Sequence, residues 1–302
     1  MARDLRTPPA AGGFEERLRA GPPILLDGAL GTELERRGCA CALPLWSAEA
    51  LLSAPALVEA IHAEYVAAGC EVLTANTFRT QRRTLAKAAL GERAEELSRL
   101  AVALARRAGS GAGRRVFVAG SAAPLEDCWH PERVPPEAEL AREHAEHAAG
   151  LAAAGVDLVL VETMGTKREA RAALAAARAA GLAACVSFTC GPGARLLSGE
   201  PLARALDELA PLGPCAVLVN CLPPRDVDAC LPVLRSMGLP FGVKPNLGAP
   251  GDGPGAPRHD ACAPDAYGAL AVGWITAGAR LVGGCCGTTP AHLRAVAERL
   301  RA

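Results

Sequence analysis

Eight short apolar runs, separated by longer stretches of helical period, are the feature that most limits how this 302-residue chain folds. Each run is nearly unbroken in apolar character, as expected when both faces of a parallel strand are buried. The runs span residues 24–26, 71–75, 116–119, 158–161, 184–188, 216–219, 241–243 and 280–282. Helical patterns occupy residues 55–68, 80–108, 136–154, 167–180, 201–209, 227–237, 266–277 and 290–301. This alternation predicts an α/β protein with a parallel sheet.

Such a sheet either closes into a barrel or stays open and doubly wound. No GxGxxG motif follows the first run, so the best sequence sign of an open dinucleotide-binding sheet is missing. We therefore predict a single (β/α)₈ TIM-type barrel domain over residues 1–302. Residues 1–20 form an N-terminal extension in this prediction, with a short helix at 14–20 that plugs the barrel. The Gly- and Pro-rich residues 248–264 are expected to form a mobile loop.

The charges of the chain are balanced, with 32 Lys and Arg against 32 Asp and Glu. Attraction to nucleic acid or to an anionic membrane needs excess positive charge, so neither partner is expected. The sequence has no apolar run of about 18 residues, and its first residues lack the apolar stretch of a signal peptide. A cytoplasmic small-molecule enzyme is predicted, in which the 12 cysteines stay reduced.

The strand ends carry the candidate functional residues, because function in a (β/α)₈ barrel lies at the C-terminal ends of its strands. In chain order, the residues at these ends are Asp27-Gly28-Ala29, Asn76-Thr77-Phe78, Glu162-Thr163, Asn220-Cys221 and Gly283-Gly284-Cys285-Cys286-Gly287. Three cysteines and two carboxylates therefore converge on one rim.

The three rim cysteines, Cys221, Cys285 and Cys286, predict a zinc site. Zinc is tetrahedral, accepts thiolates at ~2.3 Å and keeps one position open in catalytic sites. Adjacent cysteines on a glycine-flanked turn can both face one ion, because glycine permits φ angles that an extended strand does not. The alternative role of cysteine is that of a small buried hydrophobe. We assign it to Cys70, Cys185, Cys190, Cys215 and Cys230, whereas Cys39, Cys41, Cys128 and Cys262 lie in loops without an assigned role.

Several motifs resemble those of the homocysteine S-methyltransferase family. The most specific are GGCCGTTPAHL at 283–293 and VNCLPP at 219–224. The segments DGALGTELERRG, ANTFRT, VETM, SFTC and PNLGAP fall where that family has its own motifs. The family includes betaine- and S-methylmethionine-dependent enzymes and the homocysteine module of cobalamin-dependent methionine synthase. The resemblance covers nearly the whole chain and implies a (β/α)₈ barrel that binds Zn²⁺ through the three rim cysteines.

The resemblance also implies roles for the first and fourth strand ends. Asp27 and Glu162 would hold the α-ammonium of homocysteine, while the N–H groups of Gly28 and Ala29 would receive its carboxylate. An ammonium group needs anionic partners, and two rim carboxylates supply them. The alternative for the two acids is a helix N-cap or a surface ion pair.

Aromatic side chains are the candidates for holding a cationic methyl donor, and they make up only 3% of the chain. Trp46 matches a tryptophan that the family places near the donor. Asn76, Thr77 and Phe78, at the second strand end, are further candidates for substrate binding. Trp129 lies in the loop after the third strand and can line the same mouth. The alternative is that these rings pack under loops.

Four other polar residues receive predictions of their own. Lys244 departs from the family, in which a tyrosine is common, and it either pairs with a carboxylate on the donor or points away. His144 and His147 lie on one helix face at a spacing that suits a metal, but their charged neighbours predict a solvated face. His292, at the start of the last helix, is expected to be structural.

These residues together predict zinc-dependent transfer of a methyl group from a sulfonium or ammonium donor to the thiolate of homocysteine, giving methionine. A free thiol has a pKa of ~8.5, whereas a coordinating thiol is deprotonated. The chain ends one helix after Cys286 and has no folate or cobalamin module, which favours a donor like S-methylmethionine. The alternatives are a homocysteine-activating subunit of a corrinoid protein, a methyltransferase for another thiol or selenol, and a zinc-stabilised scaffold.

Overall fold

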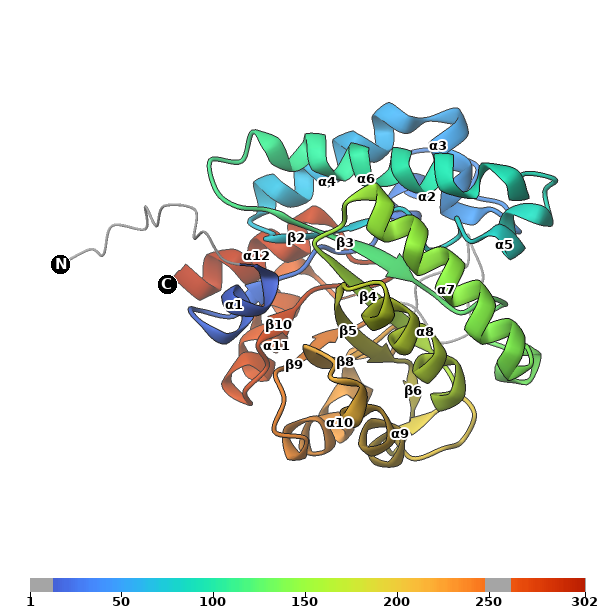
Figure 1. Ribbon diagram of the computed structural model, residues 1–302. Helices are drawn as coiled ribbons and strands as arrows, with labels where there is room; N and C mark the ends of the chain where they lie inside the picture. Colours follow the sequence, from blue (N-terminus) through green and yellow to red (C-terminus); the bar gives the residue numbers. More distant parts are fainter. Residues whose placement is uncertain (1–12, 248–261, 302) are drawn as a thin grey trace.

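The computed structural model describes residues 13–247 and 262–301 (Figure 1). Eight parallel strands form its main sheet: β1 Ile24–Leu25, β2 Val72–Ala75, β3 Phe117–Ala122, β4 Leu158–Met164, β5 Ala183–Phe188, β8 Ala216–Asn220, β9 Phe241–Lys244 and β10 Leu281–Val282. Their order is β1-β10-β9-β8-β5-β4-β3-β2, and a parallel bridge between Leu26 and Val72 brings the two outer strands together. The sheet is therefore a barrel, which confirms the predicted (β/α)₈ class. A short hairpin of β6 Cys190–Gly191 and β7 Arg195–Leu196 follows β5.

Helices surround this barrel (Figure 1). The α-helices after the N-terminal one are α2 Gly31–Arg36, α3 Glu49–Ser53, α4 Pro55–Ala68, α5 Arg82–Ala86, α6 Ala94–Ser110, α7 Glu137–Ala154, α8 Lys167–Ala179, α9 Leu202–Leu209, α10 Pro224–Ser236, α11 Pro264–Thr276 and α12 Pro290–Arg301. Short 3₁₀ turns are η1 Trp46–Ala48, η2 Gly91–Arg93, η3 Pro131–Arg133 and η4 Ala210–Leu212. Proline opens α4, α10 and α11, and left-handed glycines end α4 and α7, as these residue types favour. None of the helices in the described residues is both long and apolar enough to cross a bilayer.

The single helix predicted over residues 80–108 is wrong, because the structure divides it into α5, η2 and α6. The chain turns between these elements at Ala89, whose φ of 58° lies in the left-handed region. A helical pattern of apolar residues does not reveal such a break when alanine occupies it. The predicted loop at 248–264 lies largely outside the described residues, and α11 begins at Pro264.

Two hydrophobic clusters stabilise the barrel, one inside it and one between the strands and the helices. The inner cluster includes inward-facing strand residues together with Phe14 and Leu18 of the N-terminal helix α1, Phe14–Arg19. The ring of Phe14 meets that of Phe117 edge to face at 5.6 Å between centroids. The short helix that the sequence indicates at 14–20 therefore packs its apolar side chains into the barrel interior.

The prediction that His144 and His147 lie on a solvated face is wrong. Both are buried on α7, on the same face as Leu140 and Leu151. His147 Nε2 lies 3.0 Å from the carbonyl oxygen of Ser121, at the end of β3. The charged neighbours lie on the other side of the helix, so the 3–4 residue spacing of leucine and histidine is the better guide to burial.

His292 has the structural role expected of it. Its Nδ1 accepts a hydrogen bond from the backbone N–H of Thr289, and its Nε2 lies 3.0 Å from the carbonyl oxygen of Cys262. These contacts fix the start of α12 against the chain that leads into α11.

Candidate active site

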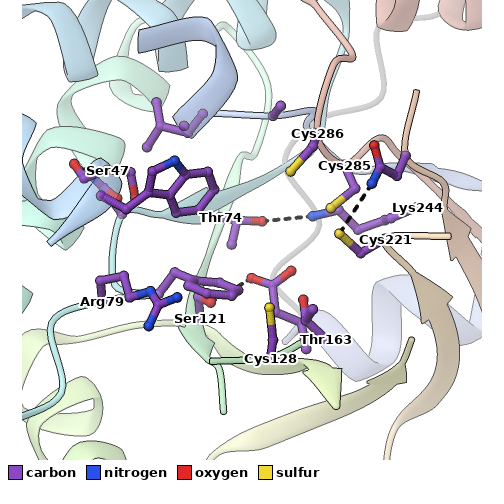
Figure 2. Close-up of a pocket in the computed structure, with 18 of the residues that line it drawn as sticks. Ser47, Thr74, Arg79, Ser121, Cys128, Thr163, Cys221, Lys244, Cys285 and Cys286 are labelled. Atoms are coloured by element: carbon purple, nitrogen blue, oxygen red, sulfur yellow. Dashed lines mark hydrogen bonds between the residues drawn. The ribbon is translucent and has the colours of Figure 1, made fainter. Parts of the chain in front are cut away.

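A cavity of about 220 Å³ opens at the C-terminal rim of the barrel (Figure 2). Nine of the predicted site residues line it: Gly28, Ala29, Trp46, Asn76, Phe78, Glu162, Cys221, Cys285 and Cys286. Thr77 does not lie among its lining residues, because the Thr77 hydroxyl exchanges hydrogen bonds with the backbone of Ser121 behind the wall. Asp27 is buried beneath Thr74, which does line the cavity.

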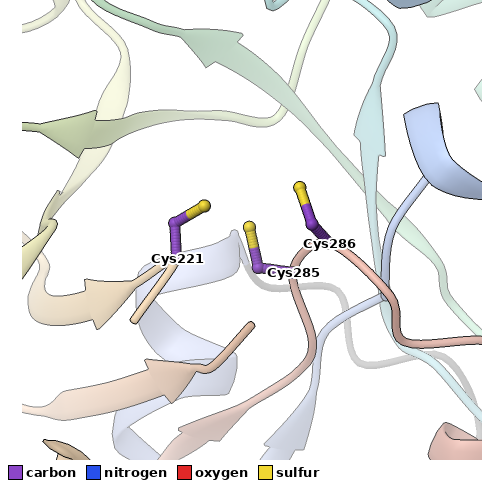
Figure 3. A group of neighbouring side chains, drawn as sticks. All are labelled: Cys221, Cys285 and Cys286. Atoms are coloured by element: carbon purple, nitrogen blue, oxygen red, sulfur yellow. The ribbon is translucent and has the colours of Figure 1, made fainter. Parts of the chain in front are cut away.

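The sulfur atoms of Cys221, Cys285 and Cys286 all lie within 4.8 Å of one another (Figure 3). Cys221 directly follows β8 and has a φ of 59°, which is unusual for a residue with a side chain. Its N–H donates to the carbonyl oxygen of Lys244, and the N–H of Cys285 donates to that of Pro245. The ends of β8, β9 and β10 are thus joined by backbone hydrogen bonds that bring the three thiols together.

The glycines around Cys285 and Cys286 act in two ways, of which the sequence indicated only one. Gly287 has a φ of 81°, as expected for a glycine that permits a tight turn. Gly284 is needed for space instead, because a Cβ there would lie 2.2 Å from the hydroxyl oxygen of Thr288. Thr288 in turn donates to the carbonyl oxygen of Cys285 at 2.7 Å.

The pKa values of the clustered thiols indicate that the cluster lacks a compensating positive charge. Hydrogen bonding to Cys285 and Cys286, followed by burial, raises the pKa of Cys221 well above its ordinary value. For Cys285, the hydrogen bond with Cys221 lowers the pKa, but the hydrogen bond with Cys286 and burial outweigh it, and the pKa rises to about 12. Three thiolates at this separation therefore need a cation, and a set of three sulfurs suits a soft one.

Asp27, Thr74 and Lys244 form a buried polar group beside the cysteines. Both carboxylate oxygens of Asp27 accept hydrogen bonds from Thr74, one from its N–H at 2.6 Å and one from its hydroxyl at 2.8 Å. Lys244 Nζ lies 3.5 Å from Asp27 Oδ1. Asp27 is thus neither a helix cap nor a surface ion pair, and Lys244 lines the cavity while it pairs with a carboxylate of the protein.

Lys244 and Glu162 titrate away from their ordinary values for related reasons. Burial lowers the pKa of Lys244, but the carboxylates of Asp27 and Glu162 outweigh it and leave the pKa raised. Burial raises the pKa of Glu162, although Lys244 and the hydroxyl of Ser121 oppose the shift. The Ser121 hydroxyl donates to Glu162 Oε1 at 2.6 Å. Glu162 and Lys244 line this end of the cavity and Asp27 is buried behind it, so two carboxylates face one ammonium and Glu162 can accept a further cationic group.

The backbone N–H of Ala29 is already engaged, since it donates to the hydroxyl of Thr288 at 3.1 Å. The N–H of Gly28 makes no hydrogen bond within the described residues. Gly28 also has no room for a side chain, because a Cβ would lie 2.7 Å from the hydroxyl oxygens of Thr288 and Tyr65. The predicted pair of carboxylate-binding N–H groups is therefore reduced to one in this conformation.

The opposite end of the cavity is aromatic. The rings of Trp46 and Phe78 meet edge to face, with centroids 5.8 Å apart. Trp46 has a φ of 45°, donates through Nε1 to Glu35 Oε1 at 3.0 Å, and packs on Gly31, where a Cβ would lie 2.3 Å from the ring. Trp129 lines the cavity as well. These rings form part of the cavity wall and are not confined beneath loops.

Comparison with known families decides the relationship of the chain. A model of the family described as homocysteine S-methyltransferase matches residues 24–300. The chain belongs to the homocysteine S-methyltransferase family.

Individual relatives agree with this family assignment. Homocysteine S-methyltransferase YbgG of Bacillus subtilis is 31% identical over 93% of this chain and 95% of its own length. Selenocysteine Se-methyltransferase of Brassica oleracea is 29% identical over 93% of this chain and 89% of its own length. The metallated crystal structure of the Escherichia coli homocysteine methyltransferase MmuM superposes with a TM-score of 0.82, at 31% identity, over 94% of this chain and 98% of that one. The chain is thus a methyltransferase.

In this family member, several residues of the site escaped the sequence analysis. Thr288 and Ser121 support the cysteine turn and Glu162, and both are small hydroxyl residues with no distinct pattern. Asn220 was seen only as a strand end, yet its amide joins Thr163 and Ser187 through hydrogen bonds of 2.6–3.0 Å. Its position directly before Cys221 is the one signal that could have identified it.

Proposed function

We propose that the chain transfers a methyl group from a sulfonium or ammonium donor to the sulfur of homocysteine, giving methionine, with Zn²⁺ held by three cysteines. The observation that carries the proposal is the convergence of the sulfurs of Cys221, Cys285 and Cys286 within 4.8 Å on the wall of a rim cavity. Membership of a homocysteine S-methyltransferase family and the metallated form of the E. coli relative support it.

The three cysteines fit zinc on chemical grounds. Sulfurs at three corners of a tetrahedron with Zn–S bonds of ~2.3 Å lie ~3.8 Å apart, which the separation of up to 4.8 Å allows. Zinc bound there would offer its fourth position to a substrate thiol and lower the pKa of that thiol. A cytoplasmic location fits this chemistry, because thiols stay reduced there.

The protein's own groups position the acceptor in this proposal. Glu162, which lines the cavity, receives the α-ammonium of homocysteine, and the buried Asp27 behind it pairs with Lys244, which keeps the surplus of negative charge small. The free N–H of Gly28 takes one oxygen of the substrate carboxylate. Such charge-assisted contacts orient the homocysteine side chain toward the cysteines.

The reaction is a displacement at the methyl carbon. The acceptor thiol loses its proton to solvent, and its sulfur forms a bond to the methyl group as the bond between that methyl and the donor's cationic sulfur or nitrogen breaks. The bonding pair stays with the donor, which leaves as a neutral thioether or tertiary amine. The rings of Trp46, Phe78 and Trp129 are placed to stabilise the donor's positive charge before transfer. A donor like S-methylmethionine is preferred in this proposal.

A selenol acceptor is the second candidate, because the Brassica relative that aligns over 93% of this chain is a selenocysteine methyltransferase. Selenium binds the same soft metal site and carries the same amino-acid ends. The experiment therefore offers selenocysteine beside homocysteine as acceptor.

Methionine formation by zinc-loaded protein tests the proposal, with S-methylmethionine, S-adenosylmethionine, betaine and dimethylsulfoniopropionate offered in parallel. We expect turnover with one donor that is lost in Cys221→Ser and kept in Cys230→Ser, whose thiol is buried on α10 away from the cavity. Silence with every donor, despite zinc and homocysteine binding, would replace this proposal with a subunit that needs a corrinoid protein.

A further inference from the structure

Arg79 is a buried arginine whose charge the described protein leaves uncompensated. It follows Phe78 after β2 and lines the cavity, with only 8% of its surface exposed. Its Nε has no hydrogen-bond partner in the described residues. Its guanidinium carbon lies 5.6 Å from the centre of the Phe78 ring. The guanidinium is always charged and carries five donors, and none of the hydrogen bonds or ion pairs among the described residues includes it.

Arg83, four residues further along the chain, is an arginine in the same region whose charge is compensated by the protein. Its guanidinium pairs with Glu126, Glu139 and Glu143, and it needs no further anion. Carboxylates are thus plentiful beside α5, yet none of the described ion pairs includes Arg79. A buried charge without a partner is costly, which indicates that Arg79 is satisfied by something that enters the cavity.

The position of Arg79 suggests which part of a ligand reaches it. In Figure 2 it lies across the cavity from Cys221, Cys285 and Cys286, and its guanidinium is next to the ring of Phe78. The acceptor's sulfur belongs at the cysteines, so the far side is left to the methyl donor. Asp127 also lines the cavity, but it forms no ion pair with Arg79 among the described residues, and its Oδ1 accepts a hydrogen bond from the N–H of Trp129.

We propose that Arg79 binds a carboxylate of the methyl donor, while the rings of Trp46 and Phe78 hold the donor's cationic centre nearer the cysteines. This inference rests on the proposed methyl transfer and adds a residue that determines donor specificity. A planar guanidinium matches a carboxylate through two parallel hydrogen bonds. A donor without an anionic group would leave Arg79 desolvated and unpaired, and the site would discriminate against it.

The test compares donors that differ only in the carboxylate. S-methylmethionine is paired with 3-aminopropyl dimethylsulfonium, and dimethylsulfoniopropionate is paired with ethyl dimethylsulfonium. For the zinc-loaded chain at saturating homocysteine, we expect kcat/KM to favour the carboxylated member of a pair on the order of 10- to 100-fold. Arg79→Gln should bring this ratio close to one, and Arg79→Lys should restore part of it. Arg142→Gln, which changes an exposed arginine on α7, should leave the ratio as it is.

Two results would overturn the inference: a wild-type chain with no preference for the carboxylated donors, or an Arg79→Gln variant with the wild-type ratio. Calorimetric binding of the same four sulfonium compounds to the zinc-loaded chain separates this inference from the proposed function. Carboxylate preference in binding that disappears in Arg79→Gln, without turnover, keeps the anion site and removes the methyl transfer. Thermal unfolding adds a structural check: loss of an unpaired buried charge should not lower Tm, whereas a marked drop in Arg79→Gln would indicate a purely structural arginine.

Discussion

The two ends of the barrel differ in how their residues are packed: the N-terminal end is filled with apolar side chains, and the C-terminal rim surrounds a cavity. At the N-terminal end, Phe14 and Leu18 of α1 pack into the inner hydrophobic cluster with Phe117. At the C-terminal rim, Trp46, Thr163 and Cys221 line the cavity in left-handed backbone conformations that cost free energy. The N-terminal end, here called the closed end, stabilises the fold. The C-terminal rim, here called the open end, holds strained residues, buried charges and clustered thiols that reduce this stability.

The largest effect that we predict concerns the thiols of the open end. Cys285→Ser should lower methyl transfer on the order of 10³-fold or more, because in the proposed function Cys285 is a metal ligand and its loss removes the activation of the acceptor thiol. The midpoint of thermal unfolding, measured without metal, should stay near that of the wild type. An unfolded Cys285→Ser variant would contradict the division between the two ends and favour a zinc-stabilised scaffold.

The next effect concerns the closed end. Phe14→Ala should lower the free energy of unfolding by about 3 kcal/mol, because it leaves a cavity where a buried ring met Phe117. Denaturant titration measures this loss, and Arg19→Ala serves as an exposed control on the same helix. The kcat/KM of folded Phe14→Ala should equal that of the wild type. A fall in kcat/KM as large as the fall in stability would show that the two ends are coupled.

An effect of intermediate size concerns the pH dependence of stability and involves His147 of α7, which contacts the carbonyl oxygen of Ser121. Burial lowers the pKa of His147 to about 4 from the 6.5 of an exposed imidazole. Between these values the unfolded chain binds more protons than the folded one, so stability is greatest above pH 6.5 and falls as the pH drops. His147→Gln should remove about 2 kcal/mol of the loss between pH 7 and pH 5. Equal pH slopes for variant and wild type would contradict the buried neutral histidine.

The smallest effect concerns Glu162. Because burial raises its pKa, its ionisation disfavours the fold: the contribution to stability is full below the unfolded pKa and is lost as the pH rises through the folded one. Glu162→Gln should therefore have a slightly higher Tm than the wild type at pH 7, whereas its KM for homocysteine should be higher on the order of 10-fold. Ser121→Ala is the matched comparison, because it keeps the carboxylate of Glu162 and removes only the hydroxyl that donates to it. A lower Tm together with an unchanged KM would assign Glu162 to the structure alone.

The regular part of the fold could be predicted from the sequence. Buried parallel strands are apolar on both faces, and each of the eight runs lies at a strand of the barrel. Irregular backbone was harder to foresee, since the left-handed residue that breaks the helix is Ala89, and the nearest sequence sign of a break is Gly91, two residues later. His144 and His147 were misjudged because charges on one side of α7 concealed the apolar period of the other.

The site divides in the same way. Residues at strand ends could be predicted, because the barrel brings every strand end to one rim, and Cys221, Cys285 and Cys286 meet there. Contacts between side chains could not. The pairing of Lys244 with Asp27 depends on the depth of both side chains, and the isolation of Arg79 depends on which carboxylates lie beyond its reach.

The most direct test of the central claim, an open metal site at the rim that takes the substrate thiol, is the X-ray absorption spectrum of the zinc-loaded chain before and after homocysteine is added. Three cysteine ligands with one vacant position predict three sulfurs and one lighter atom around zinc at first, and four sulfurs once homocysteine is bound. A coordination shell that does not change when homocysteine binds would contradict the account.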